Sequence, residues 1–151
     1  MTAKQEPREG VFRIRQTLAR GDSCRLWVTG TSMVPFLRGE KDAVILKPFD
    51  GQVRRGDLLF YSRPNGQHIL HRVHKICPDG SYLLCGDNQT ALERVRHEQV
   101  IAAVTAIERR GRQFPQNHFL WRTLSGIWMG LFFLRPALLY LMHGLWKIFK
   151  G

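Results

Sequence analysis

Six short apolar runs that follow one another through the middle of the chain constrain its fold more than any other feature of the sequence. Each run is rich in β-branched or aromatic residues, and glycine, proline, aspartate or asparagine lies between the runs. Such residues favour strands, and the PNG and PDG triplets between runs are typical of turns. The runs are RLWVTG (25–30), DAVILKPF (42–49), DLLFYSR (57–63), HILHRVHKI (68–76), SYLLCG (81–86) and QVIAAVTAIE (99–108). We therefore predict a mainly β protein built on a small coiled or barrel-like sheet.

A short helix and an unstructured lead are predicted before the first strand. Residues 11–20 place apolar side chains at helical spacing, and Gly21 follows as a stop signal. Residues 1–10 are polar and lack the apolar core of a secretion signal, so we expect no cleaved signal or anchor there. The expected division of the chain is a lead and helix, a β-rich catalytic domain and an apolar helical segment, over residues 1–21, 22–117 and 118–151.

Two uncharged apolar runs near the C-terminus indicate contact with a membrane. LSGIWMGLFFL and PALLYLMHGLW are separated only by Arg135. Residues 123–146 together have the length of a membrane span, in which Arg135 costs roughly 2.5–3.5 kcal/mol that the surrounding apolar residues offset. Pro136 favours the alternative, because proline divides a helix into shorter pieces that can lie in the interface. Both interpretations predict membrane lipid as a partner through residues 119–149.

The net charge of +11 also points to a partner, because basic proteins usually meet nucleic acid or anionic lipid. All 12 acidic residues lie before residue 118, whereas residues 118–151 carry four basic residues and no acid. No helix-turn-helix, zinc-finger or RNA-binding motif is recognisable, so we expect no nucleic-acid partner. The three cysteines, an odd number without a disulfide pattern, are expected to be reduced thiols.

Four short motifs occur in a fixed order within the β-rich region. They are S-M-V-P at 32–35, G-D-L-L-F at 56–60, H-R-V at 71–73 and G-D-N at 86–88. In this combination the chain resembles the type I signal peptidases over roughly residues 25–107. Related bacterial enzymes and SOS-repressor peptidases carry lysine before the Arg-Val pair, whereas this chain has His71. The resemblance is therefore to the Ser-His branch, which includes the endoplasmic-reticulum and archaeal enzymes.

The resemblance implies a β-rich fold and hydrolysis of peptide bonds without a cofactor. Ser32 would be the nucleophile and His71 its general base, because a serine hydroxyl needs an adjacent base at neutral pH. Asp87 is the first candidate for orienting the imidazole. The branch also uses a second acid a few positions on, where this chain offers Glu93. Whether Asp87, Glu93 or neither serves is left open by the sequence.

The residues around Ser32 are expected to bind the oxyanion and the substrate. The Ser32 N–H would hold the oxyanion, with the hydroxyl of Thr31 or Thr29 as a second donor. Gly30 supplies no side-chain donor but lets the backbone approach a ligand closely. Met33 either shapes the substrate pocket or belongs to the core. The family's substrates are extended leader or signal peptides with small residues before the cut, and we expect the same here.

A metal site is the competing interpretation of the histidine-rich run. His68, His71, His74 and Cys77 recur at every third position. On a strand, residues three apart point to opposite faces, so these side chains do not converge on one ion, and we predict no metal. Arg72 is expected to be a structural or solvated charge and not a catalytic group.

Charge around the apolar segment predicts the topology. Arg109, Arg110, Arg112 and Arg122 precede the segment, and Lys147 and Lys150 follow it. Positive residues concentrate on the cytoplasmic side, so we expect a cytoplasmic catalytic domain on a C-terminal anchor or interfacial segment. Two alternatives to a leader peptidase are a self-cleaving regulatory domain and a catalytically inactive membrane-associated module of the same fold.

Overall fold

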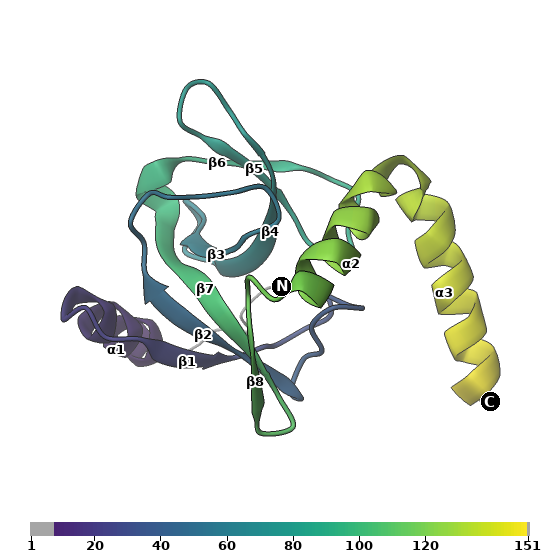
Figure 1. Ribbon diagram of the computed structural model, residues 1–151, viewed down its shortest axis with the longest axis horizontal. Coiled ribbons are helices and arrows are strands. Elements are labelled where there is room, and N and C mark those ends of the chain that lie inside the picture. The colour runs from purple at the N-terminus through teal and green to yellow at the C-terminus, as the bar shows by residue number, and fades with distance from the viewer. Residues whose placement is uncertain (1–7, 151) are drawn as a thin grey trace.

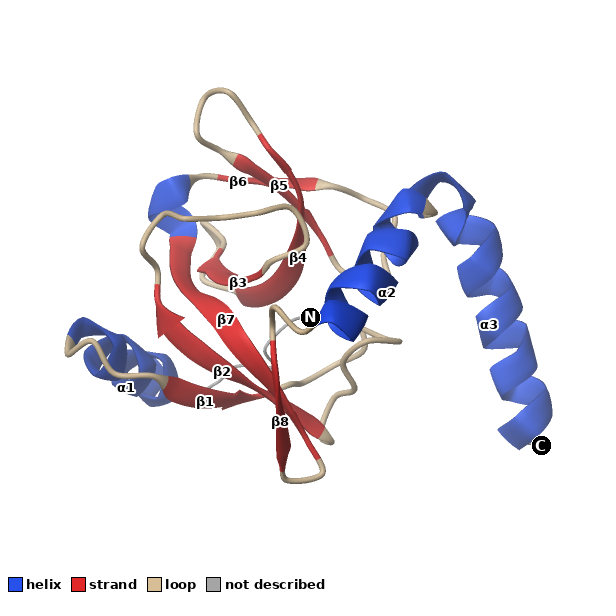
Figure 2. Ribbon diagram, viewed as in Figure 1, coloured by secondary structure: helices blue, strands red, loops and turns tan. Residues whose placement is uncertain are grey.

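The computed structural model describes residues 8–150, so most of the predicted lead lies outside the described residues. The chain forms one antiparallel sheet with a helix before it and helices after it (Figures 1 and 2). The helices are α1 (Arg8–Ala19), α2 (Phe119–Gly130) and α3 (Arg135–Lys150), with the 3₁₀ turns η1 (His97–Gln99) and η2 (Phe132–Leu134). The strands are β1 (Cys24–Trp27), β2 (Asp42–Pro48), β3 (Leu58–Ser62), β4 (His68–Ile76), β5 (Tyr82–Cys85), β6 (Glu93–Val95), β7 (Val100–Arg109) and β8 (Arg112–Pro115).

The eight strands pair in the order β1-β2-β7-β3-β4-β5-β6, and β8 adds to β7. The prediction of a mainly β protein with an N-terminal helix and C-terminal helices is confirmed. The sheet is not closed into a barrel. All six predicted runs contain a strand, and the predicted turns are present, with Gly66 and Gly80 at positive φ. Strands β6 and β8 were not predicted, because three or four mostly polar residues carry no periodic signal.

Helix α1 covers one face of the sheet with its apolar stripe. Val11, Ile14 and Leu18 are buried at the predicted helical spacing. Two of them join a core cluster with Leu26, Val44 and other strand residues. A second cluster forms on the other face of β3 and β4, around residues such as Leu59, Val73 and Leu84. The central strands are therefore buried on both faces.

The C-terminal helices lie on the opposite side of the molecule from α1, and α3 projects away from the sheet (Figure 1). Within residues 8–150, no single helix has both the length and the hydropathy to cross a membrane; α2 and residues 132–149 reach them only as a pair bent by 61°. The break lies at Leu131, between α2 and η2, and before Pro136. Proline is tolerated in the first turn of a helix, and Pro136 is the second residue of α3.

Candidate functional site

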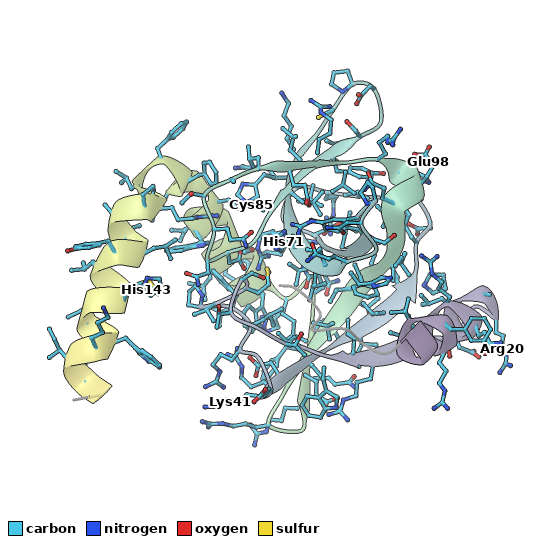
Figure 3. All side chains as sticks on the ribbon, turned by 180° about the vertical axis from the view of Figure 1, so that it is seen from behind. Arg20, Lys41, His71, Cys85, Glu98 and His143 are labelled. Atoms are coloured by element: carbon cyan, nitrogen blue, oxygen red, sulfur yellow. The ribbon has the colours of Figure 1, made fainter. Side chains whose placement is uncertain are left out.

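His71 is buried in the middle of β4, with 2% of its surface exposed (Figure 3). Neighbouring residues of a strand point to opposite faces, so His71 and Arg72 lie on different sides of the sheet. The His71 ring lies against Tyr61, with ring centroids 6.2 Å apart. The Arg72 guanidinium lies over Phe36, 5.1 Å from its ring centroid. This alternation decides which acid each residue can reach.

On its own face, His71 connects to Glu93 through a tyrosine. The Tyr61 hydroxyl lies 3.3 Å from His71 Nδ1 and donates to Glu93 Oε2 at 2.6 Å. Arg63 Nε donates to the same carboxylate at 2.6 and 3.1 Å. Burial raises the pKa of Tyr61 well above its usual value of 10.0, and the Glu93 carboxylate adds to the rise. Tyr61 therefore stays protonated.

This chain of contacts selects the tautomer of His71. A phenol has one proton, and Tyr61 gives it to the carboxylate, which only accepts. The tyrosine oxygen can then only accept from His71 Nδ1–H, which leaves the lone pair on Nε2. Burial lowers the pKa of His71 from 6.5 to about 2, and the charge of Arg63 acts in the same direction. His71 is thus a neutral imidazole with an unprotonated Nε2, as a general base requires, and burial makes that nitrogen a weak base.

Asp87 pairs with Arg72 on the other face. Arg72 Nε and Nη2 donate to the two Asp87 carboxylate oxygens at 2.9 and 2.8 Å, and both side chains are buried. Arg72 Nη1 also donates to the Gly56 carbonyl at 3.0 Å. Asp87 therefore holds the loop after β5 to the underlying strand. Arg72 is a structural charge, as predicted.

Gly86 brings the Ser32 turn and His71 together. A Cβ at this position would lie 2.6 Å from the Ser32 carbonyl oxygen and 3.0 Å from His71 Nε2, closer than real Cβ atoms approach. Only glycine fits there without movement of the backbone. Asn88 fastens the same turn, because its N–H donates to the Ser32 carbonyl at 2.8 Å and its Nδ2 to the Thr31 carbonyl at 3.2 Å.

The Ser32 hydroxyl is buried and has no hydrogen-bond partner among residues 8–150. The structure thus brings Ser32 and His71 to the same glycine without a direct hydrogen bond between their side chains. Catalytic hydrogen bonds are often long before substrate binds. Gly30 has a φ of +73°, so its freedom is used in the turn before Ser32. Met33 is 1% exposed and lies in the core, which was one of its two predicted roles.

An open cavity of about 510 Å³ lies beside His71. It is lined by His71, Arg63, Glu93 and residues 89–92. A larger cavity, of about 750 Å³, lies elsewhere, near Lys47 and Arg122, and none of the predicted site residues lines it. The smaller cavity is the better candidate for a substrate site, because the neutral imidazole of His71 is one of the side chains that line it.

The rest of the histidine-rich run does not gather around an ion. His68 stacks on Phe60, and His74 packs edge-on against Phe132. In the part of the chain that the structure describes, no three histidine, cysteine, aspartate or glutamate side chains are grouped closely enough to hold a metal.

Tyr61 is the site residue that sequence reasoning missed. No motif marks it, because its role depends on the pairing of β3 with β4 and on the position of β6, which carries Glu93. Glu93 was predicted only as a candidate acid, and in the structure its carboxylate connects to the histidine through the Tyr61 hydroxyl. Neither a model of any protein family nor any curated protein matches the chain.

Proposed function

We propose that the chain is a serine endopeptidase of the signal-peptidase type, which cleaves signal or leader peptides. The observation that carries the proposal is that the Ser32 turn and the Nε2 edge of a neutral His71 meet at Gly86. The motifs add support, because Ser32, His71 and Gly86, which belong to three of them, meet at this one place. The open, curved sheet is proposed to be a signal-peptidase catalytic fold. Its register shifts leave Ile101 and Thr105 of β7 and His74 of β4 as extra residues, and such bulges bend a strand.

The reaction follows from the proton positions. Ser32 Oγ attacks the scissile carbonyl carbon as His71 Nε2 takes the hydroxyl proton. The C–N bond breaks, the amine leaves with the proton from His71, and an acyl-serine remains. Water then attacks the ester carbonyl carbon as His71 takes its proton. The C–O bond to Ser32 breaks, Ser32 Oγ takes the proton from His71, and the acid is released. Glu93, through Tyr61, stabilises the imidazolium that forms in each half of the reaction.

Covalent labelling tests the nucleophile directly. The purified protein is expected to gain the mass of one fluorophosphonate adduct, because such probes release fluoride and phosphonylate serines that are activated by a base. Ser32→Ala is expected to gain none and to leave an alanine-rich precursor peptide uncut. Mass spectrometry measures both results. His68→Gln, on the same strand but facing Phe60, is the matched control and is expected to react like the wild type.

Three outcomes of this experiment contradict the proposal. Equal labelling and cleavage by wild type and Ser32→Ala would place the activity elsewhere. No reaction in either protein would favour the inactive membrane-associated module, which the missing Ser32–His71 hydrogen bond also favours. Cleavage within the chain itself, without cleavage of added peptide, would identify a self-cleaving domain.

We also propose that α2, η2 and α3 bind a membrane surface. Twelve of the sixteen large apolar side chains that are exposed belong to residues 119–149, with Phe133 93% and Phe149 87% exposed. Exposed apolar patches of this kind mark sites of interaction, and anionic lipid complements the net charge of +11. Arg135 is buried and turned toward the sheet, so it does not meet lipid.

The cytoplasmic orientation of the catalytic domain stays a prediction. Two of the four arginines on which it was based form salt bridges within the fold. Arg109 is held by Asp42, with Nη2–Oδ2 at 2.8 Å, and Arg122 by Asp57, with Nη2–Oδ1 at 2.5 Å. These two arginines are engaged in the fold. The other two arginines on which the prediction was based, Arg110 and Arg112, are exposed.

Sedimentation with vesicles tests the lipid surface. The wild type is expected to sediment with vesicles that contain phosphatidylserine, and Phe133→Ser with Phe149→Ser is expected to lower the binding constant at least tenfold. Burial of a phenylalanine is worth about 1.5–3 kcal/mol, and about 1.4 kcal/mol corresponds to tenfold. The pair Phe12→Ser and Trp27→Ser, which are also exposed (60% and 49%) but distant from α3, should bind like the wild type. Equal binding by both double variants would contradict the assignment.

A further inference from the structure

Helix α2 packs against both loops that form the proposed catalytic site. Phe36, in the turn that begins at Ser32, lies 6.0 Å from Trp121 and 6.5 Å from Trp128, measured between ring centroids. Trp128 Nε1 also donates to the Asp87 carbonyl at 2.9 Å. The helix therefore supports the Ser32 turn from one side and the loop after β5 from the other.

Arg135, the first residue of α3, binds this second loop more extensively. Its Nη1 lies 3.1 Å from the Gln89 carbonyl, 3.4 Å from the Gly86 carbonyl and 3.8 Å from Cys85 Sγ. Its Nη2 donates to the Trp128 carbonyl at 3.3 Å. The guanidinium also lies over the rings of Trp128 and Phe132, at 5.3 and 4.9 Å from their centroids. Residues 86–89 are thus bracketed by one side chain from the C-terminal helices.

The burial of Arg135 is hard to explain by stability alone. The residue is 0% exposed, and no carboxylate in the described structure forms a salt bridge with it. Asp87 is engaged by Arg72, and burial raises the pKa of Cys85 to about 11, which keeps the thiol neutral. A buried cation without an anion costs free energy, and an apolar residue of similar size is often equally or more stabilising. What the guanidinium supplies is a rigid fork of donors that fixes backbone carbonyls.

We propose that Arg135 is a positioning residue for peptide-bond hydrolysis, so that the C-terminal helix pair is part of the catalytic apparatus as well as a lipid-binding surface. This inference rests on the proposed function. The path is short: Arg135 holds the carbonyls of Gly86 and Gln89, Gly86 lies against His71 Nε2, and the Asn88 N–H holds the Ser32 carbonyl. Loss of the guanidinium lets this loop move, and displacement of a catalytic group by about 1 Å costs on the order of a hundredfold in rate.

The experiment compares Arg135→Met, Arg135→Lys and Arg122→Met in the full-length chain. Arg122 links α2 to Asp57 and touches neither loop, so Arg122→Met controls for loss of an arginine between the helices and the sheet. In Arg135→Met we expect amide hydrogen exchange of residues 86–89 to quicken at least tenfold. We expect kcat on the precursor peptide to fall at least tenfold with KM within threefold. Arg135→Lys should recover part of both, and Arg122→Met should match the wild type.

The two readouts separate this inference from the proposed function. If the wild type shows no Ser32-dependent cleavage, the proposed function fails, and the exchange of residues 86–89 alone reports whether Arg135 holds the loop. If the wild type is active and Arg135→Met retains its exchange and kcat, the inference is overturned. Should Arg135→Met fail to fold, Trp128→Phe removes only the indole donor to Asp87. It is expected to quicken exchange and lower kcat in the same direction, and wild-type values for both would again overturn the inference.

Discussion

His71→Gln is expected to lower kcat by roughly 10⁶-fold, the size of effect seen when the base of a serine-histidine pair is removed. Glutamine is similar in size and remains polar, but its amide does not take up the Ser32 proton. Steady-state cleavage of the precursor peptide measures the change. A loss of less than tenfold would show that another group deprotonates Ser32.

The same substitution is expected to flatten the dependence of stability on pH. The pKa of His71 is about 2 in the folded protein and near 6.5 in the unfolded chain, so between these values the unfolded state binds one more proton. Stability is therefore fully present above pH 6.5 and falls as the pH drops below it, by about 1.4 kcal/mol per pH unit. The wild type should lose about 2 kcal/mol between pH 6.5 and 5 from this residue. Urea unfolding of His71→Gln should lack that part of the loss.

His74→Gln is the comparison for both measurements: it should resemble His71→Gln in the pH dependence of stability and differ from it in kcat. Burial lowers the pKa of His74 to about 4, and Arg135 acts in the same direction, so this residue also makes stability fall with acidity. It packs on Phe132 and is not among the residues around Gly86. We expect His74→Gln to flatten the pH dependence of stability while kcat stays within about twofold of the wild type. A similar loss of kcat in both variants would mean that the effect of His71→Gln is structural.

The strands could be predicted because their signals are local. Runs such as HILHRVHKI and the turns before and after it carry their own periodicity and turn residues, and β4 occupies the predicted residues 68–76. The extent of the C-terminal helices could not be predicted in the same way. From the sequence, Arg135 was expected to oppose insertion of residues 123–146 into a membrane. In the structure its guanidinium is bound by the carbonyls of Gly86 and Gln89, which are far away in the sequence.

The residues of the proposed site could be named from the sequence, whereas the contacts between them could not. Four motifs identified Ser32, His71 and the loop of Asp87, and the structure places the Ser32 backbone and His71 Nε2 against Gly86 in that loop. The partner of each acid depends on strand faces. Arg72 follows His71 directly, so its side chain points to the opposite face, where it binds the Asp87 carboxylate. The other acid, Glu93, reaches His71 through Tyr61.

Asp87→Asn and Glu93→Gln are therefore expected to fail in different ways. Removal of one partner of a buried ion pair costs about 3–5 kcal/mol, because the remaining charge is left without compensation. Asp87→Asn leaves the buried Arg72 guanidinium without its carboxylate partner. We therefore expect the free energy of unfolding of this variant to fall by about 3–5 kcal/mol. Glu93 and Arg63 are both partly exposed, and such pairs contribute about 1 kcal/mol or less. Glu93→Gln should therefore be nearly as stable as the wild type.

Activity of the folded protein completes the contrast. Glu93→Gln keeps an acceptor for the Tyr61 hydroxyl but removes the negative charge that stabilises the imidazolium, so we expect kcat to fall about tenfold, equivalent to about 1.4 kcal/mol in the barrier. Asp87→Asn, assayed where it is still folded, should lose activity only as far as the loop after β5 moves. Urea unfolding and kcat, measured on the same samples, distinguish the two. An unaltered unfolding free energy with a large loss of kcat in Asp87→Asn would contradict the assignment of Asp87 to the buried ion pair with Arg72 and would instead assign it the orienting role.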